Sequence, residues 1–393
     1  MNDAALRIAL FTHSVNPRGG VVHTLELGGA LHEAGLDVTI FAPSVDGAPM
    51  FRASRCRVVL APVAAHANDT VTMVQTRIDA LKSALLEQQA SAFDILHAQD
   101  SISGNALAEL REARAIRGFV RTVHHLDVFT DARLSAWQQR AYADADAVFC
   151  VSDTWTRKMR DDFGIEASTV SNGVDLERFR GSNAMGDAAI CARLGVDGPS
   201  VVLAVGGIEA RKNTLQLLEA FALLRQTHAD AQLVIAGGAS LLDHDACTRR
   251  FFARAAELHL RIGPRESIVV TGPLDDDDIP ALMRRADVVS MVSVYEGFGL
   301  VTLEALAAGT PVVVSKTEPF TDYLNERVCC WAQPDDAASI ARALRRALAG
   351  EAGIDFDHAV PDLLNRFSWR DSARRHIALY ERHLQRAPRA LNA

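Results

Sequence analysis

The sequence predicts an α/β protein built from two doubly wound parallel sheets in series. Short apolar runs of strand length alternate with segments of helical periodicity through residues 7–152, and the same alternation returns through residues 201–315. Continuous apolar runs are typical of parallel strands buried on both faces, and strand–helix alternation indicates a doubly wound sheet. The chain has 393 residues, a length that suits two domains.

Eleven strands are expected from the apolar runs. The first half holds RIALFT (7–12), DVTIFAP (37–43), RVVLAP (57–62), FDILHA (93–98), GFVRTV (118–123) and AVFCVS (147–152). The second half holds VVLAVGG (201–207), LVIAGG (233–238), SIVVTG (267–272), DVVSMVS (287–293) and PVVVS (311–315). Segments with helical spacing separate them, and residues 367–387 predict a terminal helix with Trp369, Ile377, Leu379 and Leu384 as its apolar contacts.

A polar stretch with Gly and Asp residues, about 180–200, separates the two series of strands. We therefore place an N-terminal domain at 1–180, a C-terminal domain at 181–365, and a terminal helix at 366–393. Ligands on open α/β sheets bind at the carboxyl ends of the strands, and domain interfaces are favoured ligand sites. A binding cleft between the two domains is expected.

Composition excludes several classes of protein. The net charge of −8 argues against general nucleic-acid binding. Six cysteines without CxxC or framework spacing predict reduced thiols and a cytoplasmic protein. The N-terminus lacks the features of a signal peptide, and no apolar run approaches the roughly 20 residues of a membrane helix. Nothing in the sequence supports a peripheral membrane contact, and nothing indicates an oligomeric state.

Residues 295–315, YEGFGLVTLEALAAGTPVVVS, lie between two expected strands and hold the most informative motif. Glu296 follows the first of these strands, and Gly297 and Gly299 let the backbone turn without a Cβ penalty. Such a loop at the carboxyl end of a strand predicts ligand contact. We assign Glu296, Gly297, Phe298 and Gly299 to a sugar carried by the ligand; a surface acid is the alternative for the glutamate.

Helical spacing begins directly after this turn, so the N–H groups of Leu300 and Val301 are expected to be free for a phosphate. Glu304 lies one turn into the helix, and helical side chains lean toward the N-terminus. Its carboxylate only accepts hydrogen bonds, which suits the two hydroxyls of a ribose. Because Glu296 approaches from the other side of the loop, two acids around an anion site indicate a nucleotide joined to a sugar.

Positive charge for two phosphates follows another strand, in the segment AVGGIEARKNTLQLLEAF (204–221). Arg211 and Lys212 precede a helix, where cations oppose the helix dipole. That misfit predicts that they serve a diphosphate, Arg211 as a two-bond clamp and Lys212 as a point charge. A solvated basic pair is the alternative.

The first half of the chain adds two weaker signals. Gly19 and Gly20, after the first strand, can approach a distal phosphate through their N–H groups, although a plain tight turn fits equally. His124 and His125 end the strand GFVRTV, and neighbouring side chains on an extended segment point in opposite directions. We favour His124 as the one that faces the reacting sugar; two structural histidines are the alternative.

Other motifs predict structure only. Asp275 to Asp278 precede a helix, where acids stabilise the dipole, and Asn172-Gly173 is a turn signal. No His/Cys set has zinc spacing, and no G-x-G-x-x-G, P-loop or GxSxG motif occurs. We therefore expect no metal site and no cofactor, and a dehydrogenase is the least favoured enzyme class.

Together these motifs resemble the retaining glycosyltransferases of family 4, whose GT-B fold has two facing Rossmann-like domains with a cleft between them. The resemblance spans almost the whole chain. Its most specific part is EGFGL at 296–300 with Glu304, supported by SNGVD at 171–175, RKN at 211–213 and PRGG at 17–20.

The resemblance implies catalytic roles for Glu296 and His124, a ribose contact for Glu304, and neutralisation of the donor diphosphate by Arg211 and Lys212. It implies a retaining transfer of a hexose-type sugar from a nucleoside-diphosphate sugar, with no metal required. Neither the motifs nor the resemblance identifies the nucleobase, and we favour UDP on general grounds only. The terminal helix would cross back to the first domain. The acceptor would bind the N-terminal domain, where residues 61–89 either shape its pocket or merely pack.

One position departs from the family pattern. Many members carry an arginine where this chain has Gly207, and Arg211 can supply the missing charge. Two other functions stay open at this point: a nucleotide-sugar epimerase of the same fold, and a non-catalytic nucleotide-sugar-binding protein. Donor conversion without an acceptor would indicate the first, and binding without turnover the second.

Overall fold

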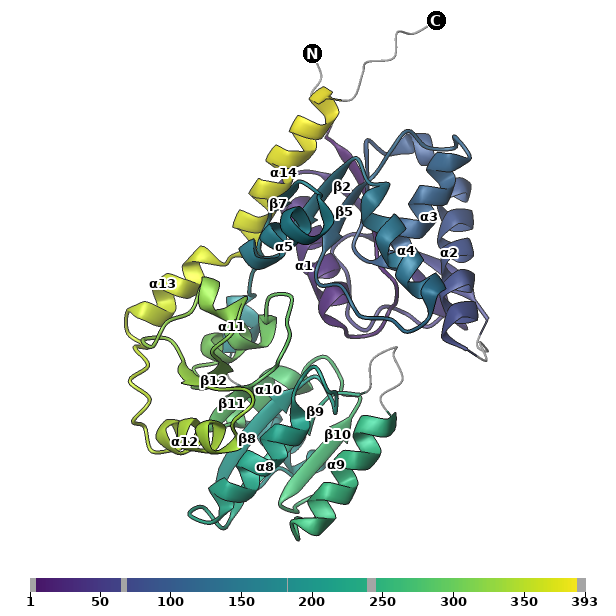
Figure 1. The fold of residues 1–393 in the computed structure, drawn as a ribbon. Helices are drawn as coiled ribbons and strands as arrows, with labels where there is room; N and C mark the ends of the chain where they lie inside the picture. The colour runs from purple at the N-terminus through teal and green to yellow at the C-terminus, as the bar shows by residue number, and fades with distance from the viewer. Residues whose placement is uncertain (1–4, 65–68, 182, 239–244, 387–393) are drawn as a thin grey trace, which may run out of the picture. The chain divides into compact units, whose positions relative to one another are not determined.

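The computed structural model describes residues 5–64, 69–181, 183–238 and 245–386, and it divides into two compact units (Figure 1). Unit 1 combines Met1–Gly173 with Ser368–Ala393, and unit 2 is Val174–Phe367. The sequence placed these divisions at 180 and 365. Residues 174–180 lie with unit 2 because their helix contacts two helices of that unit.

Unit 1 is a seven-stranded parallel sheet with helices on both faces. In spatial order its strands are β3 (Arg57–Val63), β2 (Asp37–Val45), β1 (Arg7–Phe11), β4 (Ile95–Ala98), β5 (Val120–Val123), β6 (Ala147–Cys150) and β7 (Ala167–Thr169). Its helices are α1 (Gly19–Glu33), α2 (Thr70–Glu87), α3 (Ser101–Glu112), α4 (Ala132–Ala143), α5 (Asp153–Phe163) and α14 (Trp369–Arg386), with a 3-10 turn, η1 (Ala90–Ala92).

Unit 2 is a six-stranded parallel sheet of the same design. In spatial order its strands are β10 (Ile268–Gly272), β9 (Ala231–Ala236), β8 (Ser200–Val205), β11 (Val288–Met291), β12 (Val312–Ser315) and β13 (Cys330–Ala332). Its helices are α6 (Leu176–Arg180), α7 (Ala184–Leu194), α8 (Thr214–Arg225), α9 (Asp245–Glu257), α10 (Asp278–Arg285), α11 (Leu300–Ala307), α12 (Ala337–Leu348) and α13 (Ala359–Arg366), with a 3-10 turn, η2 (Phe320–Asp322).

In both sheets, successive strands are first added on one side of the initial strand and then on its other side, and we call this point the reversal of the strand order. The chain of unit 1 starts at the central β1, proceeds to β2 and β3, and then returns to β4 on the other side of β1. Unit 2 repeats this pattern, with β8 beside β11. In sheets of this kind the ligand site lies beyond the carboxyl ends of the strands at the reversal. Each unit therefore has one favoured site, after β1 and β4 or after β8 and β11.

The core of each unit follows from the alternation of side chains along its strands. Phe11 and Phe41 stack 4.7 Å apart under α2 and α3 in unit 1. In unit 2, Val202 and Leu233 belong to the cluster that α8, α9 and α12 cover, and both are fully buried. Because both faces of each sheet are covered, the strands read in the sequence as continuous apolar runs.

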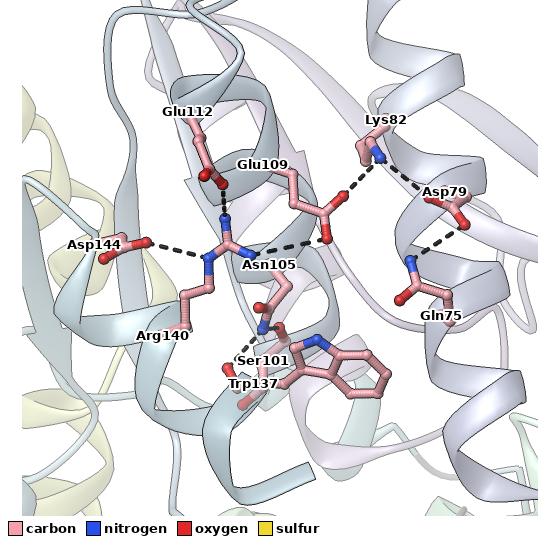
Figure 2. Close-up of polar contacts among 10 residues, drawn as sticks. All are labelled: Gln75, Asp79, Lys82, Ser101, Asn105, Glu109, Glu112, Trp137, Arg140 and Asp144. Carbon is pink, nitrogen blue, oxygen red and sulfur yellow. Dashed lines mark hydrogen bonds and ion pairs between the residues drawn. The ribbon is translucent and has the colours of Figure 1, made fainter. Parts of the chain in front are cut away.

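Polar contacts join the outer surfaces of α2, α3 and α4 (Figure 2). Glu109 of α3 accepts from Lys82 of α2 at 2.6 Å and faces Arg140 of α4 at 4.0 Å. Arg140 also pairs with Glu112 at 2.7 Å and with Asp144 at 3.3 Å. These charges are partly exposed, so they fix helix register more than they add stability.

Helix α14 packs on α1 (Figure 1). The ring of Tyr380 contacts His97 of β4 and Phe149 of β6 in the unit 1 sheet. Trp369, His376 and Tyr380 are buried, whereas Ile377, Leu379 and Leu384 are only half-buried. Of the four expected apolar contacts of this helix, only Trp369 is therefore fully in the core. The phenol of Tyr380 hydrogen-bonds His97 at 2.7 Å. A Cβ on Gly173 would lie 2.2 Å from the backbone nitrogen of Trp369, so only glycine fits there.

Candidate active site

The loop between β11 and α11 gives the carboxyl edge of unit 2 its shape. Gly299 has φ +90°, and a Cβ there would lie 2.4 Å from Phe320 Cε1. Only glycine combines that backbone with that contact. Helix α11 begins directly afterwards at Leu300, and Leu300 and Val301 are half-buried at its first turn. The predicted anion-binding helix start is therefore present beside the reversal of the sheet.

Glu296 is the centre of the charged side chains at this edge and is only 8% exposed. One carboxylate oxygen, Oε1, accepts from Arg211 Nη1 at 2.8 Å, Lys212 Nζ at 2.7 Å and Ser293 Oγ at 3.0 Å. Arg211 Nη1 also donates to the carbonyl of Tyr295 at 3.3 Å. The structure thus brings both predicted cations to the predicted sugar-binding acid.

A second acid, Glu209, lies behind Arg211. Its Oε2 lies 3.5 Å from Arg211 Nη2, and the residue is 4% exposed. Glu209 was not among the predicted site residues, although it stands two positions before Arg211 in the same loop. Among the described residues, two cations therefore face two carboxylates at this edge.

Two glycines after β8 make room for this arrangement. A Cβ on Gly206 would lie 2.8 Å from Lys212 Cε, so the lysine stem crosses that residue. Gly207 has φ +75°, and a Cβ there would lie 2.8 Å from the carbonyl oxygen of Gly238. A side chain at 207 would be strained by both its backbone and this contact. With this backbone, position 207 does not favour the arginine that the resemblance led us to expect.

The phenyl ring of Phe298 points into the core. It is 4% exposed and stacks on Tyr323 with ring centroids 5.0 Å apart. The Tyr323 hydroxyl donates to the carbonyl of Phe298 at 2.6 Å, and burial raises the pKa of Tyr323 well above its usual value. The Phe298 side chain is therefore part of the core, and of the predicted sugar contact of this residue only its backbone can take part.

Glu304 lies on the first turns of α11 and is half-buried. It shares the helix with Leu300 and Val301, whose N–H groups begin it. Residues 296–304 thus run from a buried acid through a tight turn to a second acid on a helix. This order of groups matches the sequence prediction.

Unit 1 brings together the two weaker signals of the first half of the chain. Gly19 and Gly20 form the first turn of α1, rather than a loop before it. A Cβ on Gly20 would lie 3.8 Å from His124 Cδ2, so the glycine pair and this histidine are neighbours. The His124 ring contacts the ring of His23 edge-on at 4.6 Å, and burial lowers the pKa of His124 well below its usual value. His124 is therefore neutral at pH 7.

His125 points elsewhere and lies 3.4 Å from Asp127. Asn172 is buried and accepts from His23 Nδ1 at 2.8 Å, a structural contact.

Asp278 starts α10, where it is paired with Arg193, and its Oδ2 accepts from the Asp275 backbone at 3.0 Å. No group of three or more metal-ligand side chains occurs in the described part of the chain. No described helix is long and apolar enough to cross a membrane.

The fold and the site together define the class of this protein. It has two Rossmann-like parallel-sheet domains, as in the GT-B fold. In unit 2, a Glu-Gly-Phe-Gly turn precedes helix α11 at the reversal of the strand order. Two family models match the chain, "Glycosyltransferase Family 4" over residues 17–178 and "Glycosyl transferases group 1" over residues 191–360. The chain belongs to these glycosyltransferases and is an enzyme of that class.

Curated relatives support this membership. The D-inositol 3-phosphate glycosyltransferase of Saccharomonospora viridis is 32% identical over 305 residues, covering 72% of this chain and 68% of that protein. The protein of the same name from Salinispora arenicola is 29% identical and covers 84% of this chain and 79% of its own length. An uncharacterized glycosyltransferase of Methanocaldococcus jannaschii is 31% identical, but only 45% of it is covered.

Solved structures share the fold. The sucrose-phosphate synthase of Thermosynechococcus elongatus has a TM-score of 0.77 at 22% identity, over 96% of this chain and 98% of that one. The Anabaena protein HepE in complex with UDP-glucose has a TM-score of 0.75 at 16% identity, over 96% of this chain and all of that one. These identities support the fold alone.

Proposed function

We propose that this chain transfers a hexose-type sugar from a nucleoside-diphosphate sugar, UDP-sugar being favoured, to a separate acceptor with retention at the anomeric carbon. The observation that carries the proposal is the meeting of Arg211 and Lys212 on Glu296 beside the start of α11. Two cations and a helix N-terminus suit a diphosphate, and the acid suits the sugar attached to it. The HepE complex with UDP-glucose supports this choice of donor.

Each predicted residue takes one role in the proposal. Arg211, Lys212 and the N–H groups of Leu300 and Val301 stabilise the departing diphosphate, an electrostatic task that needs no metal. Glu304 holds the ribose hydroxyls of the donor.

Glu296 and the backbone of 297–299 hold the donor sugar. In unit 1, neutral His124 donates to or accepts from a hydroxyl of the reacting sugar, and Gly19 and Gly20 offer backbone N–H groups to the distal phosphate.

Retention without a covalent sugar–enzyme intermediate requires the acceptor to attack the face from which the diphosphate leaves. The bond from the anomeric carbon to the phosphate oxygen breaks as the bond to the acceptor oxygen forms. The acceptor proton passes to the departing phosphate oxygen, so no enzymatic nucleophile is needed.

The first test is thermal stabilisation by UDP-, GDP- and ADP-sugars, because a ligand that binds only the folded state raises the melting temperature. We expect one nucleotide series to raise it in the wild type and not in Glu304→Ala or Lys212→Ala. No shift with any donor contradicts the proposal.

Product analysis then tests the reaction itself. An inverted anomer by NMR excludes retention, and loss of transfer in EDTA excludes metal independence. Conversion of the donor sugar without any acceptor would instead indicate an epimerase.

A further inference from the structure

The carboxyl edge of unit 1 contains an unexplained buried arginine. Arg121 lies within β5, opposite Ala98 of the neighbouring β4, and is 3% exposed. Its Nε and Nη1 atoms are buried and have no hydrogen-bond partner in the described structure. Nearly all buried polar groups in proteins are hydrogen-bonded, so two bare N–H groups on one guanidinium require a cause.

The acid that attracts Arg121 does not touch it. Asp100 follows β4, and its charge favours the charged form of Arg121, yet no ion pair or hydrogen bond joins the two side chains. Its Oδ1 accepts from the Ser103 backbone at 2.8 Å. Its Oδ2 is buried without a hydrogen bond, 3.6 Å from Nδ1 of His13. Two buried donor nitrogens of Arg121 and a buried acceptor oxygen of Asp100 are therefore without hydrogen bonds at the same edge of the sheet.

These side chains lie at the edge of the sheet where ligands are expected to bind. His13 follows β1 and Asp100 follows β4, the two strands at the reversal of the unit 1 sheet. Open sheets bind ligands beyond the carboxyl ends of those strands. The side chains of Asp100 and His13 are 18% and 15% exposed, so these two residues are more accessible to solvent than the buried Arg121.

A second buried cation changes the balance of charge. Arg77 of α2 is 9% exposed, donates to the His13 carbonyl at 3.1 Å, and is attracted by Asp100. Arg121 and Arg77 together carry two positive charges against the one negative charge of Asp100. Burial lowers the pKa of Arg121 only to about 10, so it remains charged at neutral pH.

We propose that Arg121, Arg77 and Asp100 form the acceptor subsite of this enzyme, and that it selects an anionic polyol: a hydroxyl neighbouring a phosphate or carboxylate group. The oxyanion accepts from Nε and Nη1 of Arg121 and offsets the excess charge, and the hydroxyl donates to Oδ2 of Asp100. Arginine is suited to a two-bond contact with such oxyanions. The inference rests on the proposed function, since it names the class of acceptor.

The test uses calorimetric titration of the full chain with and without saturating UDP. The probes are myo-inositol 1-phosphate, glucose 6-phosphate and glucuronate, each against its neutral parent, myo-inositol or glucose. We expect at least one anionic probe to bind at least tenfold more tightly than its parent. Arg121→Gln should remove that preference, and the matched control Arg7→Gln, at the opposite end of the sheet, should keep it.

Asp100→Asn keeps the test decisive if Arg121→Gln fails to fold. This variant should bind the anionic group as tightly as the wild type or more tightly, and it should lose the hydrogen bond from the hydroxyl. The affinities for the anionic probe and for inorganic phosphate should therefore become more similar. The inference is overturned if no anionic probe binds, or if the neutral parents bind as tightly as the anionic probes. It is also overturned if both variants match the wild type, as they would if a buried water molecule satisfied these polar atoms. UDP binding in the same samples separates this failure from failure of the proposed function.

Discussion

Replacing Glu296 with glutamine should tighten the binding of a nucleotide that carries no sugar. Arg211 and Lys212 both donate to Glu296 Oε1, at 2.8 and 2.7 Å. A diphosphate must therefore compete with a buried carboxylate for the same two cations. Glutamine keeps the shape of the side chain and removes its charge.

The size of the effect follows from these two contacts. Each hydrogen bond between charged groups contributes about 1.5–3 kcal/mol, and most of that is regained when the cations bind phosphate. A remaining difference of about 1.4 kcal/mol corresponds to a tenfold lower dissociation constant for UDP. Sugar transfer should fall at least about 100-fold, as for the loss of one transition-state contact.

Calorimetric titration with UDP and with pyrophosphate measures the effect directly. Glu304→Gln is the matched control. It should weaken the binding of UDP, which has a ribose, and leave the affinity for pyrophosphate unchanged. The reasoning is refuted if Glu296→Gln binds pyrophosphate no more tightly than the wild type does. In that case the contacts of Glu296 would not compete with a diphosphate.

Three further predictions concern pH, the missing arginine and the turn. Burial lowers the pKa of His23 from 6.5 to about 4 and that of His376 from 6.5 to about 3. Unit 1 should therefore have its full stability above pH 6.5 and lose about 2 kcal/mol of unfolding free energy per histidine by pH 5. Urea unfolding at pH 7 and pH 5 measures this loss. Gly207→Arg should not restore donor binding to Arg211→Ala, because residue 207 has φ +75° and faces a carbonyl oxygen; donor titration of the double variant measures it. Phe298→Ala should cost about 3–5 kcal/mol of stability, because the ring is core, and Phe298→Leu should keep UDP-sugar affinity within a few-fold.

Each of these has a clear contrary result. Equal unfolding free energies at pH 7 and pH 5, or no flattening of the pH dependence in His23→Gln, would mean that the histidines are not buried as described. Rescue by Gly207→Arg would show that the loop after β8 adapts to a side chain. Loss of donor binding in a stable Phe298→Leu protein would place the ring at the sugar.

The strands and the Glu-Gly-Phe-Gly turn before α11 were predictable because both depend on short stretches of sequence. Each of the eleven expected apolar runs contains a strand, and the order of charges around α11 follows from residues 296–304. The eleven runs do not include β7 (Ala167–Thr169) or β13 (Cys330–Ala332), because each is only three residues long. The three residues of β7 are also half-buried rather than apolar core. Local periodicity cannot identify so short an element.

Partners distant in sequence could not be predicted. Glu296 meets Arg211 only because β8 and β11 are neighbours in the sheet, and Phe298 enters the core because Tyr323 and Phe367 receive it. Arg121 did carry a local signal, a charge inside the apolar run GFVRTV. A buried arginine in a central strand is rare enough to suggest a ligand or an ion pair.

The return of α14 to unit 1 has a consequence for biosynthesis. A ribosome makes a chain from its N-terminus, and domains generally fold in that order as they emerge. Here the Tyr380 hydroxyl that bonds His97, and the Trp369 ring beside His23, are synthesised only after all of Val174–Phe367. Unit 2 can therefore complete its structure first, and a nascent chain lacking these last residues would expose the histidine-lined face of unit 1 to chaperones and proteases.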